Sequence, residues 1–245
     1  MNILDKNALV TGTRRIGAVV ARVLAEKGAN VALVYHRSQA EALTTAQSVL
    51  QLGRKALTVQ ADISKAQEVK SMVKQVIQEL GGVDILVNVA SSYHSAPFEQ
   101  MSEADWDGQL DSNLKSVFLC SQAVAANMKA RGGGRIINFA DWIAASGRPR
   151  YKDYLAYYVS KKGVIGLTEA LALELAPEVL VNAIAPGPIL PPPGISEEEN
   201  QEVLNATPLG RWGGEMEIAK TVISLIESDF ITGECIRVDG GRHVQ

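Results

Sequence analysis

Short apolar runs alternate with longer amphipathic stretches along most of the chain. The runs are rich in Val, Ile and Leu, and the clearest are Ala8–Val10, Val31–Tyr35, Ile85–Val89, Ile136–Phe139 and Val179–Ile184. Continuous apolar runs of this length, without polar alternation, predict strands that are buried on both faces of a sheet.

Between these runs, apolar residues recur at the spacing of a helix face. One stripe consists of Ile16, Val19, Val20, Val23 and Leu24, and a second of Val69, Met72, Val73, Val76, Ile77 and Leu80. Both stripes predict amphipathic helices, and Gly28, Gly53 and Gly81 follow the expected helix ends. The alternation, repeated about six times, predicts an α/β fold: a single-domain, Rossmann-type, doubly wound parallel sheet with helices on both faces.

The composition excludes several classes of protein. The chain has 245 residues, of which 47% are hydrophobic and 21% charged, as is typical of one globular domain. A net charge of −3 provides no basic excess, so we expect neither a nucleic-acid nor a membrane partner. Cys120 and Cys235 form no disulfide framework or zinc motif, and no signal peptide is evident. We therefore expect a cytoplasmic protein without a metal site.

A glycine turn follows the first predicted strand and opens the first predicted helix. It runs from Thr11 to Gly17 and contains Gly12, Arg14, Arg15 and Ile16. Such a turn directs backbone N–H groups and a helix N-terminus toward one point, where an anion binds. A pair of glycines alone is weak evidence, because a plain tight turn has the same pattern.

The end of the second predicted strand bears on the choice of dinucleotide. An NAD site usually presents an acidic side chain there, about 20 residues after the turn. This chain instead has His36, Arg37 and Ser38, and Arg14 and Arg15 lie in the turn itself. Because guanidinium groups match phosphate geometry, we expect NADPH rather than NADH, although exposed arginines on a solvated face are the alternative.

A tyrosine and a lysine stand four residues apart in a later helical stretch. Tyr157 and Lys161 would share one helix face, where the lysine charge would lower the pKa of the phenol and allow it to donate a proton. Tyr158 and Lys162 have the same spacing, so spacing alone does not choose between the two pairs.

In order along the chain, these motifs resemble the short-chain dehydrogenase/reductase family over nearly the whole sequence. Ser160 directly before the lysine selects the pair Tyr157 and Lys161 as the family's Tyr-x-x-x-Lys signature. The resemblance implies that Asn113 is the structural and proton-relay asparagine. It also implies cofactor contacts at Asp62, Ile63, Asn88, Val89, Ala90, Pro186, Gly187 and Ile189, in addition to the glycine turn, the 36–38 segment, Tyr157 and Lys161.

Three departures from the family pattern carry further information. The glycine turn is one residue shorter than usual and lacks the middle glycine, and Asp141 stands where the family has its catalytic serine. This aspartate, the Arg15-Ile16-Gly17 turn and the 36–38 segment are similar to the pteridine reductase branch and to bacterial dihydromonapterin reductase. That resemblance implies that Ser92 and Tyr93 contact the substrate and that Tyr93 stacks on a pterin; the alternatives are a loop aromatic and, for Asp141, a helix cap.

The resulting hypothesis is a reductase that moves a hydride from NADPH to a C=O or C=N carbon of a small substrate, with a pterin-like heterocycle as the favoured substrate. Tyr157 supplies the proton, directly or with Asp141, whose pKa we expect to be raised. The alternatives are a 3-oxoacyl-[acyl-carrier-protein] reductase, a sugar or alcohol dehydrogenase, and a non-catalytic NADPH sensor.

The segment after Gly187 contains the consecutive prolines Pro191, Pro192 and Pro193, which neither a helix nor a central strand accommodates. In the resembled family this region covers the substrate, so we expect a substrate loop or lid at about residues 188–212. Ser196 and Glu199 form an expected capping box. The resemblance also implies a homotetramer.

Overall fold

Seven parallel strands form one sheet in the computed structural model, which describes residues 1–147 and 149–244. In sheet order the strands of this part of the chain are β3 (Ala56–Gln60), β2 (Asn30–Tyr35), β1 (Asn7–Thr11), β4 (Ile85–Asn88), β5 (Gly134–Phe139), β6 (Val179–Pro186) and β7 (Cys235–Val238). The order reverses between β1 and β4, which pair directly with each other. In a doubly wound sheet, ligands bind beyond the strand ends at this reversal.

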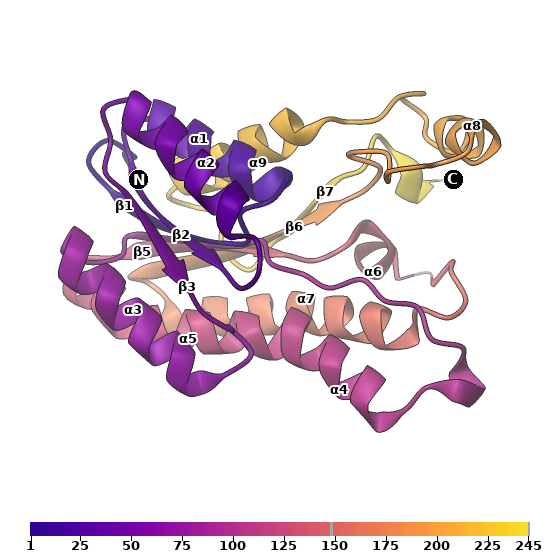
Figure 1. The fold of residues 1–245 in the computed structure, drawn as a ribbon, viewed down its shortest axis with the longest axis horizontal. Coiled ribbons are helices and arrows are strands. Elements are labelled where there is room, and N and C mark those ends of the chain that lie inside the picture. The colour runs from indigo at the N-terminus through magenta and orange to yellow at the C-terminus, as the bar shows by residue number, and fades with distance from the viewer. Residues whose placement is uncertain (148, 245) are drawn as a thin grey trace.

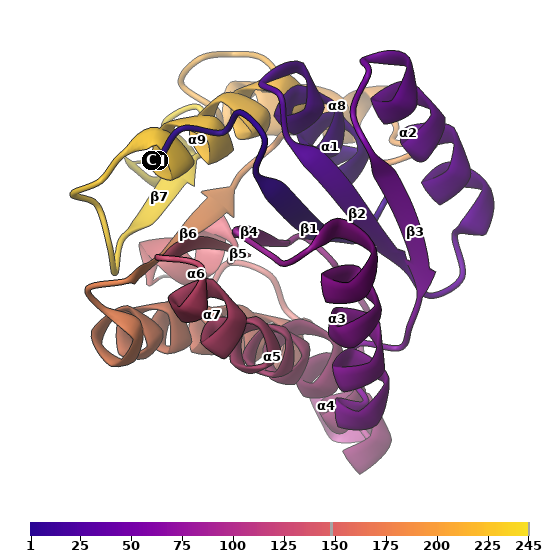
Figure 2. The same cartoon turned by 90° about the vertical axis from the view of Figure 1, so that its left-hand side faces the viewer.

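Helices cover both faces of the sheet (Figures 1 and 2). One layer contains α1 (Ile16–Glu26), α2 (Gln39–Gln51) and α9 (Glu215–Glu227); the other contains α3 (Ala66–Leu80), α5 (Ser116–Ala130) and α7 (Leu155–Leu175). Successive strand residues point to opposite layers: Val10 packs with Leu24 of α1, and Leu9 packs with Val73 of α3. This burial on both sides explains why the strands are apolar throughout.

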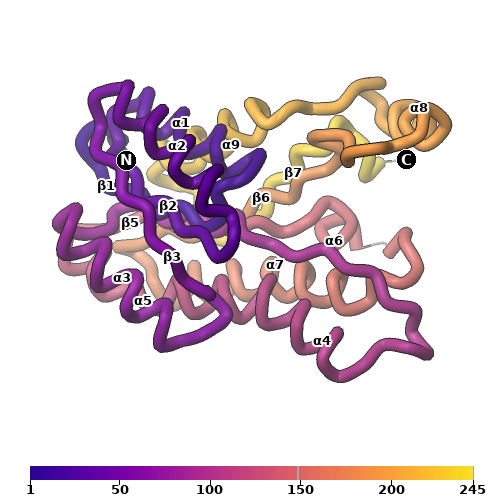
Figure 3. Tube along the Cα trace, viewed as in Figure 1, coloured from indigo at the N-terminus to yellow at the C-terminus, as the bar shows by residue number. Residues whose placement is uncertain are grey.

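The remaining elements lie around the ends of the strands. They are the short helices η1 (Phe98–Gln100), α4 (Glu103–Leu110), the π-helical turn η2 (Asp111–Lys115), α6 (Trp142–Ser146), α8 (Glu197–Asn205) and η3 (Arg242–Val244). Figure 3 shows that the chain between β6 and α9 extends outward to include α8, at the same end of the molecule as the C-terminus. No helix of the described chain has the length and apolarity needed to cross a membrane.

The predicted fold class is confirmed, and each of the five apolar runs forms a strand. The two amphipathic stripes form α1 and α3, and Gly81 adopts the left-handed conformation that ends α3. Strands β3 and β7 were not among the five predicted runs, because their sequences ALTVQ and CIRV are short, only half-buried at most positions and contain polar residues. The capping box at Ser196 and Glu199 is also confirmed at the start of α8.

Candidate active site

The glycine turn brings the start of α1 against the end of β4. Gly12 has φ +83°, and a Cβ there would lie 3.0 Å from the backbone nitrogen of Ala90. A Cβ on Gly17 would lie 1.9 Å from the carbonyl oxygen of Gly12, so neither glycine has room for a side chain. Arg15 has φ +47° directly before α1, a left-handed conformation that usually favours glycine. The shortened turn therefore closes with an arginine in strained backbone.

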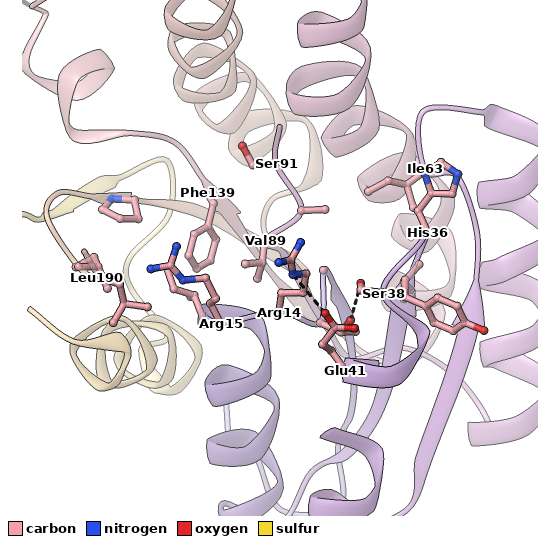
Figure 4. Close-up of a pocket in the computed structure, with 18 of the residues that line it drawn as sticks. Arg14, Arg15, His36, Ser38, Glu41, Ile63, Val89, Ser91, Phe139 and Leu190 are labelled. Atoms are coloured by element: carbon pink, nitrogen blue, oxygen red, sulfur yellow. Dashed lines mark hydrogen bonds and ion pairs between the residues drawn. The ribbon is translucent and has the colours of Figure 1, made fainter. Parts of the chain in front are cut away.

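A cavity of about 780 Å³ opens beyond the carboxyl ends of the strands, beside this turn (Figure 4). Most of the residues predicted to bind the cofactor line it. They are Gly12, Arg14, Arg15, Ile16, His36, Arg37, Ser38, Ile63, Val89, Ala90, Tyr157, Lys161, Pro186, Gly187 and Ile189. Residues from several strand ends and from α1 and α7 thus meet at one site, as the topology of the sheet requires.

Three of the predicted cofactor residues do not line this cavity: Gly17, Asp62 and Asn88. Gly17 packs behind the turn, as described above. The Asp62 carboxylate accepts hydrogen bonds from the backbone and hydroxyl of Ser64, which lower its pKa against the effect of burial, and Asn88 donates to the Asn138 side chain across β4 and β5. The structure therefore places these three predicted cofactor residues outside the lining of the cavity.

The cavity also has lining residues that the sequence did not identify. These are Thr13, Glu41, Ser91, Phe139, Leu190 and Trp212, among others. Trp212 lies more than 20 residues after Ile189 in sequence, at the end of the excursion through α8, and its indole donates to Asn200 at 2.9 Å. No local motif marks such a residue, because only the return of the chain brings it to the site.

The proton-transfer residues meet at the inner end of the cavity. Tyr157 and Lys161 lie on α7, and Asp141 follows β5. The Tyr157 hydroxyl donates to Asp141 Oδ2 at 2.9 Å, and Lys161, buried to 3% exposure, donates from Nζ to the carbonyl oxygen of Phe139 at 2.8 Å. Lys161 Nζ also lies 5.9 Å from the centre of the Tyr157 ring. Three ionisable groups therefore lie together beside the cavity, with Lys161 buried and Asp141 and Tyr157 partly buried.

Asp141 forms the helix cap that the sequence offered as an alternative, and it also contacts Tyr157. Its Oδ1 accepts from the backbone N–H of Ile143 at 2.8 Å and caps α6, while its Oδ2 accepts from Tyr157. The helix cap fixes the carboxylate orientation, so that the second oxygen faces the phenol. As expected, the pKa of Asp141 is raised; burial is the largest cause, against hydrogen bonds from Ile143 and Tyr157 and the charge of Lys161, which lower it.

The expected lowering of the Tyr157 pKa is wrong for this arrangement. Burial raises the pKa of Tyr157 well above its ordinary value, and the charge and hydrogen bond of Asp141 raise it further. Burial lowers the pKa of Lys161 to about 8, although Asp141 acts in the opposite direction. The prediction considered the lysine alone, and the structure places a carboxylate closer to the phenol. Tyr157 therefore keeps its proton at neutral pH, and the raised pKa makes it a weaker acid than the sequence predicted. Its role as proton donor remains a prediction.

Asn113 lies in the π-helical turn η2 and is fully buried. Its Oδ1 accepts from Ser92 N at 2.8 Å and from Ser91 Oγ at 3.0 Å, and its Nδ2 lies 3.2 Å from Ser160 Oγ on α7. These bonds tie the chain after β4 to the helix that carries the catalytic pair. They fit the structural half of the role implied for Asn113, and its part in a proton relay remains a prediction.

The predicted substrate residues separate into different surroundings. Tyr93 is 54% exposed and lines a second cavity of about 700 Å³ that also reaches Asp141 and Tyr157. Its ring stacks on Tyr154 with centroids 4.4 Å apart and planes at 14°, and meets Tyr157 edge-on at 4.6 Å. Ser92 instead lines a separate cavity of about 260 Å³. Tyr93 is thus beside the reacting groups, but one face of its ring is already covered by Tyr154.

Comparisons with known proteins give matches over nearly the whole chain. A family model described as Enoyl-(Acyl carrier protein) reductase matches residues 10–243. The chain is 39% identical over 247 residues to 3-oxoacyl-[acyl-carrier-protein] reductase FabG of Staphylococcus epidermidis, covering 98% of this chain and 100% of the relative. The solved short-chain dehydrogenase/reductase from Serratia marcescens BCRC 10948 superimposes with a TM-score of 0.92 at 33% identity, covering 99% and 100% of the two chains.

This chain belongs to the short-chain dehydrogenase/reductase family. It is therefore an oxidoreductase. A further family structure, a blue fluorescent protein from a metagenomic library in complex with NADPH, has a TM-score of 0.91 at 32% identity and covers 99% of each chain. The names of these relatives do not mention pterin reduction, so the resemblance to the family is confirmed while the narrower resemblance to the pteridine reductase branch is not shown. Within the described residues, no group of three or more His, Cys, Asp or Glu side chains could hold a metal ion.

Proposed function

We propose that this short-chain dehydrogenase/reductase transfers a hydride from NADPH to the carbon of a C=O or C=N bond while Tyr157 delivers the proton. The observation that carries the proposal is the 2.9 Å hydrogen bond from Tyr157 to Asp141, with Lys161 buried beside them. Burial and the nearby carboxylate keep the phenol protonated, and Lys161 supplies a compensating positive charge when the phenol gives up its proton.

The residues of the cavity fit NADPH. The glycine turn packs at Gly12 against the backbone of Ala90, and the N-terminus of α1 follows the turn at the cavity, which suits a pyrophosphate. Arg14 of this turn and Arg37 and Ser38 after β2 also line the cavity, where a 2′-phosphate would find guanidinium and hydroxyl donors. The family structure that holds NADPH supports this assignment. When bound, the nicotinamide supplies the hydride.

The first candidate substrate is the ketone of a 3-oxoacyl thioester. The comparisons support this alternative better than the pterin hypothesis, because the FabG relative matches the whole length of the chain. The second cavity offers room of about 700 Å³ and leads from Asp141 and Tyr157 to the surface past Tyr151 and Tyr154. An acyl chain is apolar, and this lining of aromatic rings suits it.

One specific observation favours a flat heterocycle, such as a pterin, as the second candidate. Asp141 stands at the family's serine position with a raised pKa, so it can either accept a hydrogen bond from a ring N–H or donate one to a ring nitrogen. A 3-oxoacyl ketone offers only acceptors near its reacting carbon, and an ionised carboxylate would repel them. Tyr93 and Tyr154 add stacking surface beside this carboxylate.

The test is the initial rate of NADPH oxidation by the purified protein with an acetoacetyl thioester and, separately, with a dihydropterin. Turnover of the thioester alone would support the first candidate, and turnover of the dihydropterin alone would support the second. Asp141→Ser is the matched variant: it should retain thioester reduction if Asp141 merely replaces the serine, and lose dihydropterin reduction if the carboxylate binds the ring. Tight NADPH binding with no turnover of any C=O or C=N compound would contradict the proposal.

Residues 188–212 fit the role of a substrate loop. The Arg15 guanidinium donates to the carbonyl oxygen of Pro191 at 3.1 Å, so the glycine turn and this loop are joined across the cavity. Arg15→Ala should therefore make the loop more accessible to limited proteolysis, and an unchanged cleavage rate would argue against this contact.

A tetramer is also part of the proposal. The exposed apolar residues Phe118 on α5 and Leu173 on α7, at 40% and 82% exposure, support burial of these helices against other copies of the chain. Sedimentation equilibrium tests it, and a monomer across the working concentrations would refute it.

A further inference from the structure

An acidic side chain lies among the basic residues of the NADPH cavity. Glu41 is in the first turn of α2, and its carboxylate lies 3.6 Å from Nε of Arg14. Figure 4 shows this pair beside Ser38, with both side chains lining the cavity. The pair is accessible, since Arg14 is 71% exposed and Glu41 is 49% exposed. A ligand can therefore reach both groups without disturbing the core.

Glu41 differs from its surroundings in charge. Among the described residues that line the cavity, the carboxylates are Glu41 and Asp141. Asp141 is at the other end, bonded to Tyr157, so Glu41 is the acid at the end that carries Arg14 and Arg37. The sequence offered no sign of this, because an acidic residue in the first turn of a helix is ordinarily explained by the helix dipole.

We propose that Glu41 helps to set the preference of the enzyme between NADPH and NADH. Its carboxylate makes the preference for NADPH weaker than Arg14 and Arg37 alone would give. This inference rests on the proposed use of NADPH. A 2′-phosphate carries a charge of about −1.5 to −2 and is repelled by a nearby carboxylate. Arg14 must also break its ion pair with Glu41, or divide its N–H donors between Glu41 and the phosphate, before its guanidinium can bind the phosphate.

The same carboxylate has the opposite effect on NADH. A ribose 2′-hydroxyl is a donor, and a carboxylate at this end of the cavity can accept its hydrogen bond. Glu41 thus favours the hydroxyl and opposes the phosphate, while Arg14 and Arg37 favour the phosphate. The two sets of charges leave the enzyme able to bind both dinucleotides, with NADPH bound more tightly.

The experiment compares the Kd values of NADPH and NADH for the intact protein and for Glu41→Gln by isothermal titration calorimetry. Glutamine keeps the size of the side chain and removes its charge. Because the pair is exposed, the expected effect is moderate: NADPH binding tightens about three- to tenfold at about 20 mM salt, NADH binding weakens or stays unchanged, and the gain shrinks at about 300 mM salt.

A matched control is available outside the cavity. Glu227 pairs with Lys27 at 3.2 Å and is 48% exposed, so Glu227→Gln removes the same charge from a similarly exposed carboxylate that does not line the cavity. It should leave both Kd values unchanged. In an Arg14→Gln background, the effect of Glu41→Gln on NADPH should fall by at least half, because part of it acts through Arg14.

The outcomes separate the inference from the function on which it rests. If the intact protein binds no NADPH, the proposed cofactor is wrong. If it binds NADPH but Glu41→Gln leaves the NADPH Kd unchanged, or shifts the NADPH and NADH values equally, Glu41 has no part in the preference and the inference alone is refuted. An undiminished effect in the Arg14→Gln background would refute the exchange of Arg14 between carboxylate and phosphate.

Discussion

Replacement of Tyr157 by Phe removes one oxygen atom from the site and leaves its packing. The edge contact with Tyr93 at 4.6 Å and the position of Lys161 beside the ring depend on the ring and not on the hydroxyl. The hydroxyl itself makes the 2.9 Å bond to Asp141. Tyr157→Phe therefore separates proton donation from the binding of the cofactor and the shape of the cavity.

Two magnitudes follow for Tyr157→Phe. Loss of a positioned general acid should lower kcat about 10²- to 10⁴-fold, equivalent to about 2.7 to 5.5 kcal/mol in the barrier. Loss of a hydrogen bond to a carboxylate should cost at most about 1.5 to 3 kcal/mol of folding stability. The stability cost should be smaller at low pH: the pKa of Asp141 is raised and the lost bond was lowering it, so Asp141 binds a proton more readily in the variant.

The assay combines initial rates of NADPH oxidation, the Kd of NADPH and urea unfolding at two pH values. For Tyr157→Phe we expect a large loss of kcat, with the Kd of NADPH changed less than about threefold. A variant that keeps a rate within about threefold of the parent would show that Tyr157 is not the acid. A parallel loss of NADPH binding would show that the hydroxyl serves the cofactor instead.

Three further changes test other parts of the site. Gly12→Ala should destabilise the fold by about 1 to 2 kcal/mol and weaken NADPH binding, because φ is +83° and the new Cβ would lie 3.0 Å from Ala90 N. An unchanged free energy of urea unfolding would refute the tight packing of Gly12 against Ala90. Asp141→Asn should stabilise the protein more at pH 8 than at pH 4 in urea unfolding, because the raised pKa of Asp141 means that the parent loses stability as pH rises above the ordinary value of 3.8; an equal effect at both pH values would contradict this. Because the pKa of Lys161 is lowered to about 8 from 10.5, the unfolded chain binds more protons between these values and stability should rise with pH there; Lys161→Met should abolish that rise, and a variant with the same slope as the parent would count against the buried lysine.

The sequence predicted the fold because the fold depends on local patterns, and the prediction of Tyr157 and Lys161 as the catalytic pair uses the same kind of pattern. Apolar runs mark buried strands, and the choice of Tyr157 over Tyr158 rests on Ser160, which lies fully buried against Asn113. The glycine turn could also be predicted from the sequence, because its backbone leaves no room for a side chain at Gly12.

The relations between distant side chains were beyond such patterns. The order of residues around Tyr157 does not give the burial of its phenol, which is the largest cause of its raised pKa, nor the 2.9 Å bond to Asp141, which raises that pKa further. The stacking of Tyr93 on Tyr154 depends on how two loops meet, and Trp212 reaches the cavity only after the excursion through α8. The pKa of Tyr157, the stacking of Tyr93 and the position of Trp212 all depend on long-range packing. The pair Tyr157 and Lys161, in contrast, was predicted from spacing within one helix.

The central claim is that NADPH bound in this cavity gives its hydride to a substrate carbon while Tyr157 gives the proton. The most direct measurement uses NADPH deuterated at either the pro-R or the pro-S position of nicotinamide C4, in separate reactions with acetoacetyl thioester and dihydropterin, followed by mass spectrometry of the product. The account predicts one deuterium per product molecule, transferred from one face of the nicotinamide only, and almost no product with Tyr157→Phe. Bound NADPH with no deuterium in any product, or equal transfer by Tyr157→Phe, would contradict it.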